Sequence, residues 1–311
     1  MIYRIAFSLL LTLTSFSLQA KDSYFFKGLN KDWSMPWDGH QGVLSLDIPF
    51  CIDQSLASYG QTQSTQTPKI NYKIQVIGSV GANGLFEASK GQEKIPFELS
   101  LVSNGSPHDL KNGADSQELT SSSLCPSGQL KLSVKTKGDL HKIKAGDYRA
   151  SLRVRAQSND INISQDGLID LTIKIPKIVS IKTPDPIKLR ALHKLKEETY
   201  ICVYRNGHEA YNLKATGLNN KKGDFQVFLD GASGQAGEHK ALNYDVSITP
   251  PGGSRITLVP NNLAKGLMGS SDPGCNGREQ LKLEVSVNKK AAQNVYAGKY
   301  QGQLKLTVEV Q

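Results

Sequence analysis

The chain has 311 residues, and at roughly 100–200 residues per domain this length favours two domains. Apolar residues make up 38% and charged residues 21%, which is too polar for a protein with several membrane spans and too apolar for a disordered chain. Lysine and arginine total 37 against 28 acidic residues, and this formal charge of +9 is spread along the chain, which suits an anionic surface or glycan as a partner.

The first twenty residues have the features of a secretory signal peptide. Arg4 precedes an apolar run from Ile5 to Phe16, and the segment closes on Ser17-Leu18-Gln19-Ala20, which predicts cleavage before Lys21. No later stretch approaches the roughly 18 apolar residues that cross a bilayer. We therefore expect an exported chain.

Four cysteines divide the chain into two similar halves. In an exported chain, cysteines indicate disulfides rather than a metal site. Of the three possible pairings, the simplest joins neighbours in sequence and closes loops of 74 and 73 residues, with Cys51–Cys125 in the first half and Cys202–Cys275 in the second.

The two halves also share sequence motifs. Leu130-Lys131-Leu132 follows the second cysteine as Leu281-Lys282-Leu283 follows the fourth, and Ala145-Gly146-Asp147-Tyr148 corresponds to Ala297-Gly298-Lys299-Tyr300. Inside the loops, Phe97 to Leu101 mirrors Tyr244 to Ile248. Each half is therefore a copy of one domain.

Almost every apolar pattern has a period of two, which is typical of β-strands. Turn signals such as Asn83-Gly84 and Pro251-Gly252-Gly253 separate these runs, whereas the run from Ile187 to Glu198 is ambiguous between helix and strand. The predicted fold is all-β, with two tandem immunoglobulin-like antiparallel sandwiches that each hold one disulfide. We place the boundary between residues 165 and 166, at Asp166-Gly167, with the first domain at 21–165 and the second at 166–311.

The two copies differ after their shared tyrosine strand. A further short segment, Asp160 to Ile163, follows that strand in the first copy, whereas the last alternating strand of the second copy runs out at Gln311. This asymmetry predicts that the second sandwich lacks its final strand.

Catalytic and metal-binding motifs are not found. The six histidines show no i,i+4 pairing and none neighbours a cysteine, and the sequence holds neither a Gly-x-Ser-x-Gly elbow nor a phosphate-binding glycine loop. We expect no enzymatic activity, no cofactor, no metal and no nucleic-acid partner.

Two features could serve recognition. Tyr24, Phe25, Phe26, Trp33 and Trp37 crowd the start of the exported chain, where packing onto the first core is favoured over an exposed binding patch. The polar stretches 55–67 and 103–123 are either binding loops at one end of a sandwich or surface loops without a partner.

Several motifs of the second half resemble those of a known protein family. Cys202-Val203-Tyr204 is followed by Asn206-Gly207, then by Leu242-Asn243-Tyr244, and the half closes on Tyr296-Ala297-Gly298-Lys299-Tyr300-Gln301-Gly302. In these motifs the chain resembles the tip adhesins of alpha-type chaperone–usher pili, the CfaE/CblD family. Archaic-type pilins share part of the Ala-Gly-x-Tyr pattern.

The resemblance implies an adhesin domain at 21–165 and a pilin domain at 166–311 that is completed by a strand from another subunit. It implies four partners: a periplasmic pilus chaperone, an outer-membrane usher, a major pilin that donates the strand, and a host glycan or surface receptor. The chain would be exported through the periplasm to the pilus tip and would initiate assembly. Lys21 to Trp37 does not alternate like a donor strand, which agrees with a tip position. The groove for the added strand would involve Tyr300, Leu304, Leu306, Val308 and Val310.

The receptor-binding residues of the family do not map directly onto this sequence. Relatives carry a basic pair after the strand that corresponds to Leu152-Arg153-Val154, where this chain has Ala156 and Gln157. Its candidate receptor-binding residues are Arg149, Arg153 and Arg155, which alternate along one strand, together with Trp33 and Trp37. Two alternatives stay open: an archaic-type tip adhesin for abiotic surfaces, and a free secreted glycan-binding protein with both sandwiches complete.

Overall fold

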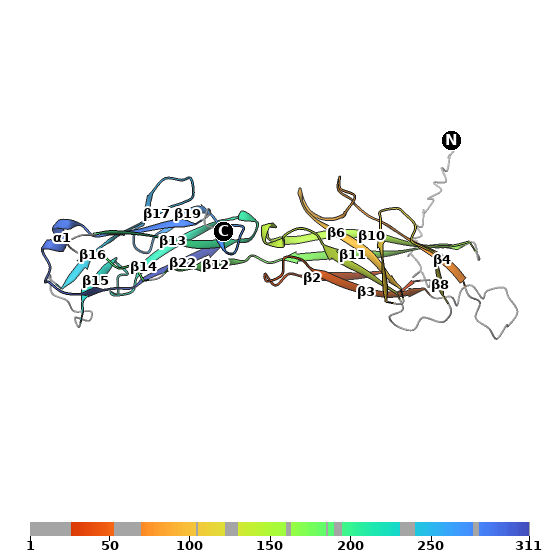
Figure 1. Cartoon of the computed structure of the whole chain (residues 1–311), viewed down its shortest axis with the longest axis horizontal. Coiled ribbons are helices and arrows are strands. Elements are labelled where there is room, and N and C mark those ends of the chain that lie inside the picture. Colours follow the sequence, from red (N-terminus) through yellow and green to blue (C-terminus); the bar gives the residue numbers. More distant parts are fainter. Residues whose placement is uncertain are drawn as a thin grey trace, which may run out of the picture.

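A computed structural model describes residues 26–52, 70–103, 105–121, 130–159, 163–184, 186–189, 195–230, 240–275 and 280–310. The predicted signal peptide, Cys125 and the polar stretch 55–67 lie outside these residues. The described strands form two bodies that follow one another along the long axis of the molecule (Figure 1).

The described residues of the first body form eleven strands and a 3₁₀ turn that precedes the tenth. Its elements are β1 (Phe26–Lys27), β2 (Lys31–Pro36), β3 (Ser45–Ile52), β4 (Ile70–Ile77), β5 (Phe86–Lys90), β6 (Glu93–Ser103), β7 (Ser106–Leu110), β8 (Leu119–Ser121), β9 (Leu130–Thr136), η2 (Leu140–Lys142), β10 (Gly146–Ser158) and β11 (Ile163–Ile175). The strands join in the order β1-β3-β9-β6-β5-β10-β11-β2, and β4, β7 and β8 pair beside this path. All these pairs are antiparallel except β11 with β2, which run parallel.

The second body is built from three smaller sheets. Its elements are β12 (Val179–Lys182), β13 (Lys196–Arg205), η3 (Asn206–His208), β14 (Ala210–Gly217), β15 (Gln226–Leu229), β16 (Ala241–Asn243), β17 (Asp245–Thr249), β18 (Ile256–Thr257), β19 (Leu263–Met268), β20 (Leu281–Ser286), α1 (Lys289–Gln293), β21 (Tyr300–Gln301) and β22 (Leu304–Val310). The sheets have the orders β12-β13-β20-β17-β18, β19-β14-β22 and β16-β15-β21.

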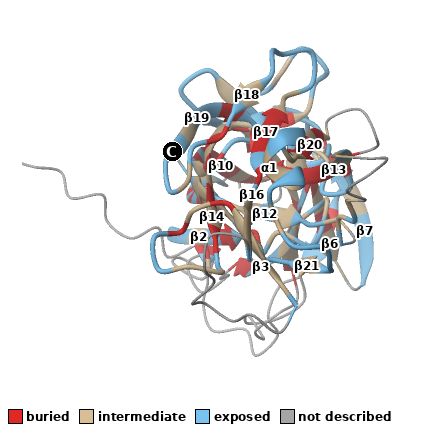
Figure 2. Ribbon diagram, turned by 90° about the vertical axis from the view of Figure 1, so that its left-hand side faces the viewer, coloured by how far each residue is buried: buried red, intermediate tan, exposed pale blue. Residues whose placement is uncertain are grey.

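The alternating sequence patterns explain this architecture. Every second residue of a strand points to the same face, so an alternating run buries one face and leaves the other in water. Figure 2 shows buried positions along the strands and exposed positions on loops and outer faces. The buried side chains form two hydrophobic cores, one in each body, which confirms the predicted all-β fold of two domains.

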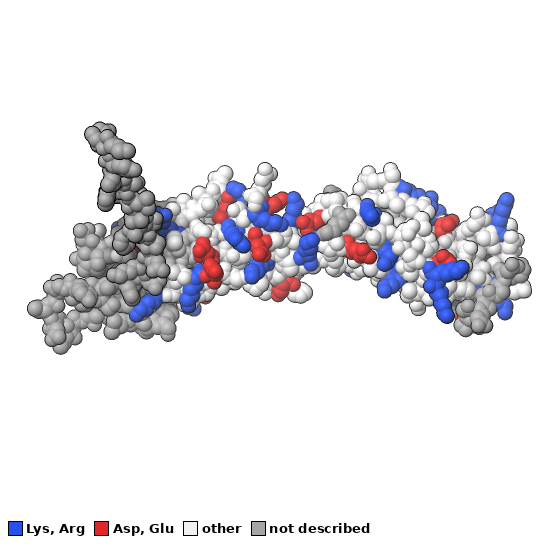
Figure 3. All heavy atoms as spheres, turned by 180° about the vertical axis from the view of Figure 1, so that it is seen from behind, with Lys and Arg blue, Asp and Glu red and all other residues white. Residues whose placement is uncertain are grey.

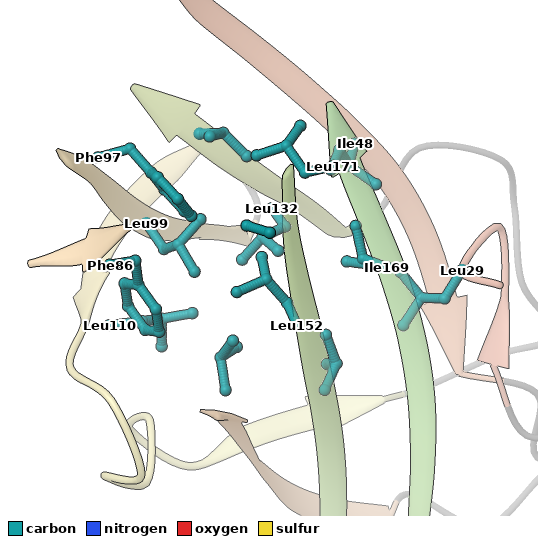
Figure 4. Packing of buried hydrophobic residues seen from close by; sticks show 14 of the residues in the cluster. Leu29, Ile48, Phe86, Phe97, Leu99, Leu110, Leu132, Leu152, Ile169 and Leu171 are labelled. Carbon is teal, nitrogen blue, oxygen red and sulfur yellow. The ribbon is translucent and has the colours of Figure 1, made fainter. Parts of the chain in front are cut away.

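The predicted domain boundary is wrong. β11 pairs with β10 along its whole length, from Gly146 opposite Ile175 to Ser158 opposite Ile163. Its inward residues Ile169 and Leu171 lie in the first core beside Leu152 (Figure 4). The segment predicted to open the second domain is therefore the last strand of the first, and the change from one core to the other follows Ile175.

In the run from 187 to 198, the described residues 187–189 and 195–198 are not helical. Ile187 and Leu189 lie in a segment without regular structure, and Lys196 begins β13. Two prolines, Pro184 and Pro186, precede this segment, and proline restricts the residue before it to extended backbone.

One of the two predicted disulfides can be followed in full. Cys202 and Cys275 are bonded and lie 73 residues apart, which confirms the pairing predicted for the second domain. Cys51 is also disulfide-bonded. Its predicted partner, Cys125, lies outside the described residues.

Candidate functional site

The last strands of the two domains are equivalent in structure. Tyr148 donates a hydrogen bond from its hydroxyl to the carbonyl of Lys144 at 3.0 Å, and Tyr300 donates the same bond to the carbonyl of Tyr296 at 2.9 Å. From these tyrosines onward, β10 pairs antiparallel with β4 as β22 pairs with β14. Residue 148 thus corresponds to residue 300, and every position of β10 has a counterpart 152 residues later.

In the first domain, β10 has a neighbour on both sides. β4 pairs with one edge and β11 with the other. Beneath β11, the inward side chains of Leu152 and Val154 are each 1% exposed, and that of Ala156 is fully buried. The tyrosine strand of the first copy is therefore paired on both edges and buried on its inner face.

In the second domain, the equivalent strand β22 stands at the end of its sheet. Within the described residues it pairs with β14 alone. Its inward side chains Leu304, Leu306 and Val308 pack against the second core but stay only half-buried, and Val310 is 37% exposed. We call these four residues the β22 edge. Tyr300, the fifth predicted groove residue, is half-buried in β21.

Further half-buried aliphatic side chains belong to the same core. Ile181 of β12, with Ile187 and Leu189 after it, packs against the second core. β12 lies beside β22 at the inner end of the second domain (Figure 1). In the first domain, β11 lies between β10 and β2.

This geometry has a chemical consequence. A strand edge without a neighbour presents main-chain donors and acceptors that another strand can satisfy. Half-buried aliphatic side chains beside such an edge gain free energy when an incoming strand covers them. The β22 edge can therefore bind an extended peptide by strand addition.

The three predicted arginines share the outer face of β10. Arg149 and Arg153 are exposed, whereas Arg155 is half-buried. Arg155 holds Asp166 of β11 with two hydrogen bonds, from Nε at 2.7 Å and from Nη2 at 3.1 Å. The hydrogen bond from Arg155 lowers the pKa of the Asp166 carboxyl.

Asp166 reduces the positive charge of this face. Its Oδ2 also lies 3.9 Å from Nε of Arg153, and Ser151 donates to Asp170 on the same face. Basic and acidic side chains are likewise intermixed along both domains on the face seen in Figure 3. The arginines thus lie together as predicted, but only Arg149 and Arg153 remain open to a ligand.

The two tryptophans do not form an exposed patch. Trp37 is 2% exposed and donates from its indole Nε1 to the carbonyl of Gln41 at 2.6 Å. Trp33 is half-buried against the first core. Trp37 is therefore a packing residue, and Trp33 packs against the same core, in line with the packing role that the sequence favoured over an exposed patch.

The second polar stretch, 103–123, contains two β-strands, β7 and β8. β7 pairs with β6, and β8 pairs with β4. Between them, the Ser116 hydroxyl accepts a hydrogen bond from the backbone of Ile74 at 2.9 Å. β7 and β8 therefore extend the first sheet, and the segment between them is tied to β4.

Other kinds of site are not found in the described part of the chain. It holds no group of three or more histidine, cysteine, aspartate or glutamate side chains placed to bind a metal ion. None of its helices is long and apolar enough to cross a membrane.

Comparison with known proteins gives likenesses only among solved structures. No family model and no curated protein matches the chain. One similar structure is a chain of the CsuC–CsuE chaperone–tip adhesion subunit complex from archaic chaperone–usher Csu pili of Acinetobacter baumannii. It has 14% identity and a TM-score of 0.46, over 90% of this chain and 97% of that chain.

Two further likenesses are to adhesins. CfaE, the adhesive subunit of CFA/I fimbria of enterotoxigenic Escherichia coli, has 14% identity and a TM-score of 0.37, over 89% of this chain and 91% of that one. The CupB6 tip adhesin from Pseudomonas aeruginosa has 10% identity and a TM-score of 0.39, over 91% of each chain. The solved structures that the chain resembles thus include chaperone–usher tip adhesins, at an identity that leaves its function to be argued from its own geometry.

Proposed function

We propose that this protein is the tip adhesin of a chaperone–usher pilus and that its second domain accepts a strand from another polypeptide. The supporting observation is the difference between two copies of one strand within the same chain. β10 is covered by β11, whereas the described residues pair β22 on one side only and leave its aliphatic side chains half-buried. Among the described residues, β22 thus lacks the second neighbour that β11 gives to β10.

The added strand comes first from a periplasmic chaperone and then from a major pilin subunit. Both supply main-chain hydrogen bonds to the β22 edge and side chains that cover it, as in other cases of strand addition. The first domain, which carries its own β11, binds the receptor. Because its second domain accepts a strand, the protein also initiates pilus assembly at the outer-membrane usher.

Separate expression of the two domains tests this proposal. We expect residues 21–175 to accumulate in the periplasm as a folded, protease-resistant domain, because β11 completes their sheet. Residues 176–311 should be degraded unless a pilus chaperone or a donor peptide is supplied. Limited proteolysis of both fragments, with and without the donor, measures the difference. Two fragments that each unfold cooperatively alone would instead favour a free secreted glycan-binding protein.

For the receptor, we propose an anionic glycan bound on the outer face of β10 by Arg149 and Arg153. Both guanidinium groups are exposed and project from the same side of one strand. Arginine pairs well with carboxylate and sulfate groups because its planar fork donates two parallel hydrogen bonds. Ala156 and Gln157 occupy the positions at which the resembled adhesins carry a basic pair. We therefore expect a ligand that differs from theirs.

Charge reversal tests the arginine face. The double variant Arg149→Glu and Arg153→Glu should lose at least about tenfold in affinity for a sulfated glycan array, since each charged hydrogen bond is worth roughly 1.5–3 kcal/mol. The matched control, Lys111→Glu with Lys135→Glu, changes the charge equally at exposed positions after β7 and on β9. Equal loss in both variants would show that net charge, not this face, attracts the glycan.

A further inference from the structure

The last strand of the first domain is an internal example of a strand that pairs with the tyrosine strand. β11 faces the first core with alternate residues, and three of them, Ile169, Leu171 and Ile173, are fully buried aliphatic side chains. Gly167 lies on the same inner face, opposite Val154 of β10, but carries no side chain. The inner face of β11 therefore has one small position beside a row of large ones.

Buried side chains from the start of the domain leave no room at this small position. A Cβ atom at Gly167 would lie 2.9 Å from Cδ1 of Leu29 and 3.1 Å from Cδ2 of Phe26. Leu29 and Phe26 are only 4% and 5% exposed, so neither can move aside without disturbing the packed core. The backbone at Gly167 has no positive φ, so its conformation does not require glycine. Lack of space therefore keeps this position small.

The second domain has a counterpart of Phe26. β1 and β12 each pair antiparallel with the strand that holds the first cysteine of their domain, with Phe26 opposite Ile52 and Ile181 opposite Val203. Ile52 and Val203 are each the residue directly after that cysteine. Ile181 thus occupies the place of Phe26, but it is only half-buried against the second core.

Ile181 and Leu306 mark the place that Gly167 fills in the first domain. Leu306 is the counterpart of Val154, and β12 lies beside β22. The second domain therefore has a larger side chain on β22 and a smaller one on β12 than the first domain has at these places. These two differences offset one another in part, so the incoming strand has room for a residue about the size of glycine or alanine.

We propose that the β22 edge selects the strand that it accepts by the size of one residue. The residue opposite Leu306 is glycine or alanine, and the inward residue opposite Leu304 is a large aliphatic one. The second requirement follows because Leu304 is the counterpart of Leu152, which lies opposite Ile169 of β11. This inference rests on strand addition at the β22 edge and goes further, because it specifies the sequence pattern of the incoming strand.

The small position also fixes the register of the incoming strand. A slip of one residue would turn its aliphatic side chains towards water. A slip of two residues would place a large side chain opposite Leu306, where Ile181 leaves no room for it. One alignment alone then satisfies both the alternation and the size requirement.

Peptides with the sequence of β11 test this selection without any change to the protein. The full chain is refolded with a labelled peptide of residues 163–175, and fluorescence anisotropy measures the affinity. Gly167→Val in the peptide should weaken binding by roughly 5- to 100-fold, because an oversized side chain must displace packed neighbours. Valine favours extended strands more than glycine does, so strand propensity alone would change the affinity in the opposite direction. Gly167→Ala should stay within about threefold of the unmodified peptide.

Ser164→Val in the peptide is the matched control, because residue 164 is exposed on the outer face of β11. This peptide should bind as the unmodified one does. Equal binding of the Gly167→Val and unmodified peptides would overturn the size selection and leave strand addition standing. Equal losses from both valine substitutions would overturn it as well, because the loss would not depend on the inner face. If even the unmodified peptide failed to bind, strand addition at this edge would be wrong, and the size selection with it.

Shortening a side chain of the protein gives an independent measurement. Leu306→Ala should reduce the ratio between the affinities of the unmodified and Gly167→Val peptides to below about threefold, because it makes room for the valine. Ile181→Ala should change the ratio in the same direction. Thr307→Ala, on the opposite face of β22, is the control and should keep the ratio of the unmodified chain. A ratio that stayed the same in both the Leu306→Ala and Ile181→Ala chains would contradict the proposal.

Discussion

Replacing Leu306 by aspartate is expected to abolish the capture of an added strand by the second domain. Leu306 is half-buried on β22, and its counterpart in the first domain, Val154, is 1% exposed beneath β11. A donor strand would therefore bury the new carboxylate among aliphatic side chains without a partner. The cost of burying such a group corresponds to a loss of affinity of at least about 100-fold.

A labelled peptide of residues 163–175, the sequence of β11, can measure this loss. The full chain is refolded with the peptide, and fluorescence anisotropy reports the bound fraction. Thr307→Asp is the matched control, because it adds the same charge on the opposite face of β22, opposite Lys214 of β14. Co-purification with a pilus chaperone should follow the same order. Equal capture by both variants would place the accepting surface elsewhere.

Sequence patterns were sufficient to predict the architecture because a half-buried strand records its environment in every second residue. Leu130 and Leu132 in β9, like Leu281 and Leu283 in β20, are buried as their alternation predicts. The duplication was equally visible, and the matching hydrogen bonds of Tyr148 and Tyr300 confirm it.

The boundary was missed because one strand contains a turn signal. Asp166-Gly167 usually marks a turn, since aspartate and glycine favour turn conformations. Here Asp166 faces outward and is held by Arg155 across the strand pair. A Cβ atom at Gly167 would lie 2.9 Å from the Leu29 side chain, so glycine fills a crowded position on the inner face. Both residues serve pairing and packing within β11.

The candidate sites could be predicted only in part. Alternation identified the β22 edge, because position in a strand determines which side chains share a face. It could not show that Asp166 neutralises Arg155, which depends on the strand that pairs with β10. Nor could it foresee the contact between the domains, where Asn206 bonds to carbonyls of segments distant in sequence.

Appending a copy of β11 to the second domain should stabilise that domain, whereas Leu306→Asp should prevent it from binding an added strand. Appending residues 160–175 after Gln311 reproduces the connection that follows β10, since position 311 corresponds to position 159 of the first copy. The appended strand would lie antiparallel to β22 in the register of β10 and β11. Each aliphatic side chain of the β22 edge that it covers should contribute roughly 1 kcal/mol. We expect residues 176–311 to become protease-resistant and their thermal midpoint to rise by about 10 °C or more.

The matched control keeps the composition of the appended strand and inverts its faces. It exchanges residue 169 with 170, 171 with 172, and 173 with 174, which turns Ile169, Leu171 and Ile173 towards solvent. Because side chains alternate along a strand, this change presents polar groups to the β22 edge and should remove the stabilisation. Differential scanning calorimetry of the two fusions decides the matter. If the inverted strand stabilised the domain as well as the native one, the gain would come from chain extension alone, and the second sandwich would not need a strand.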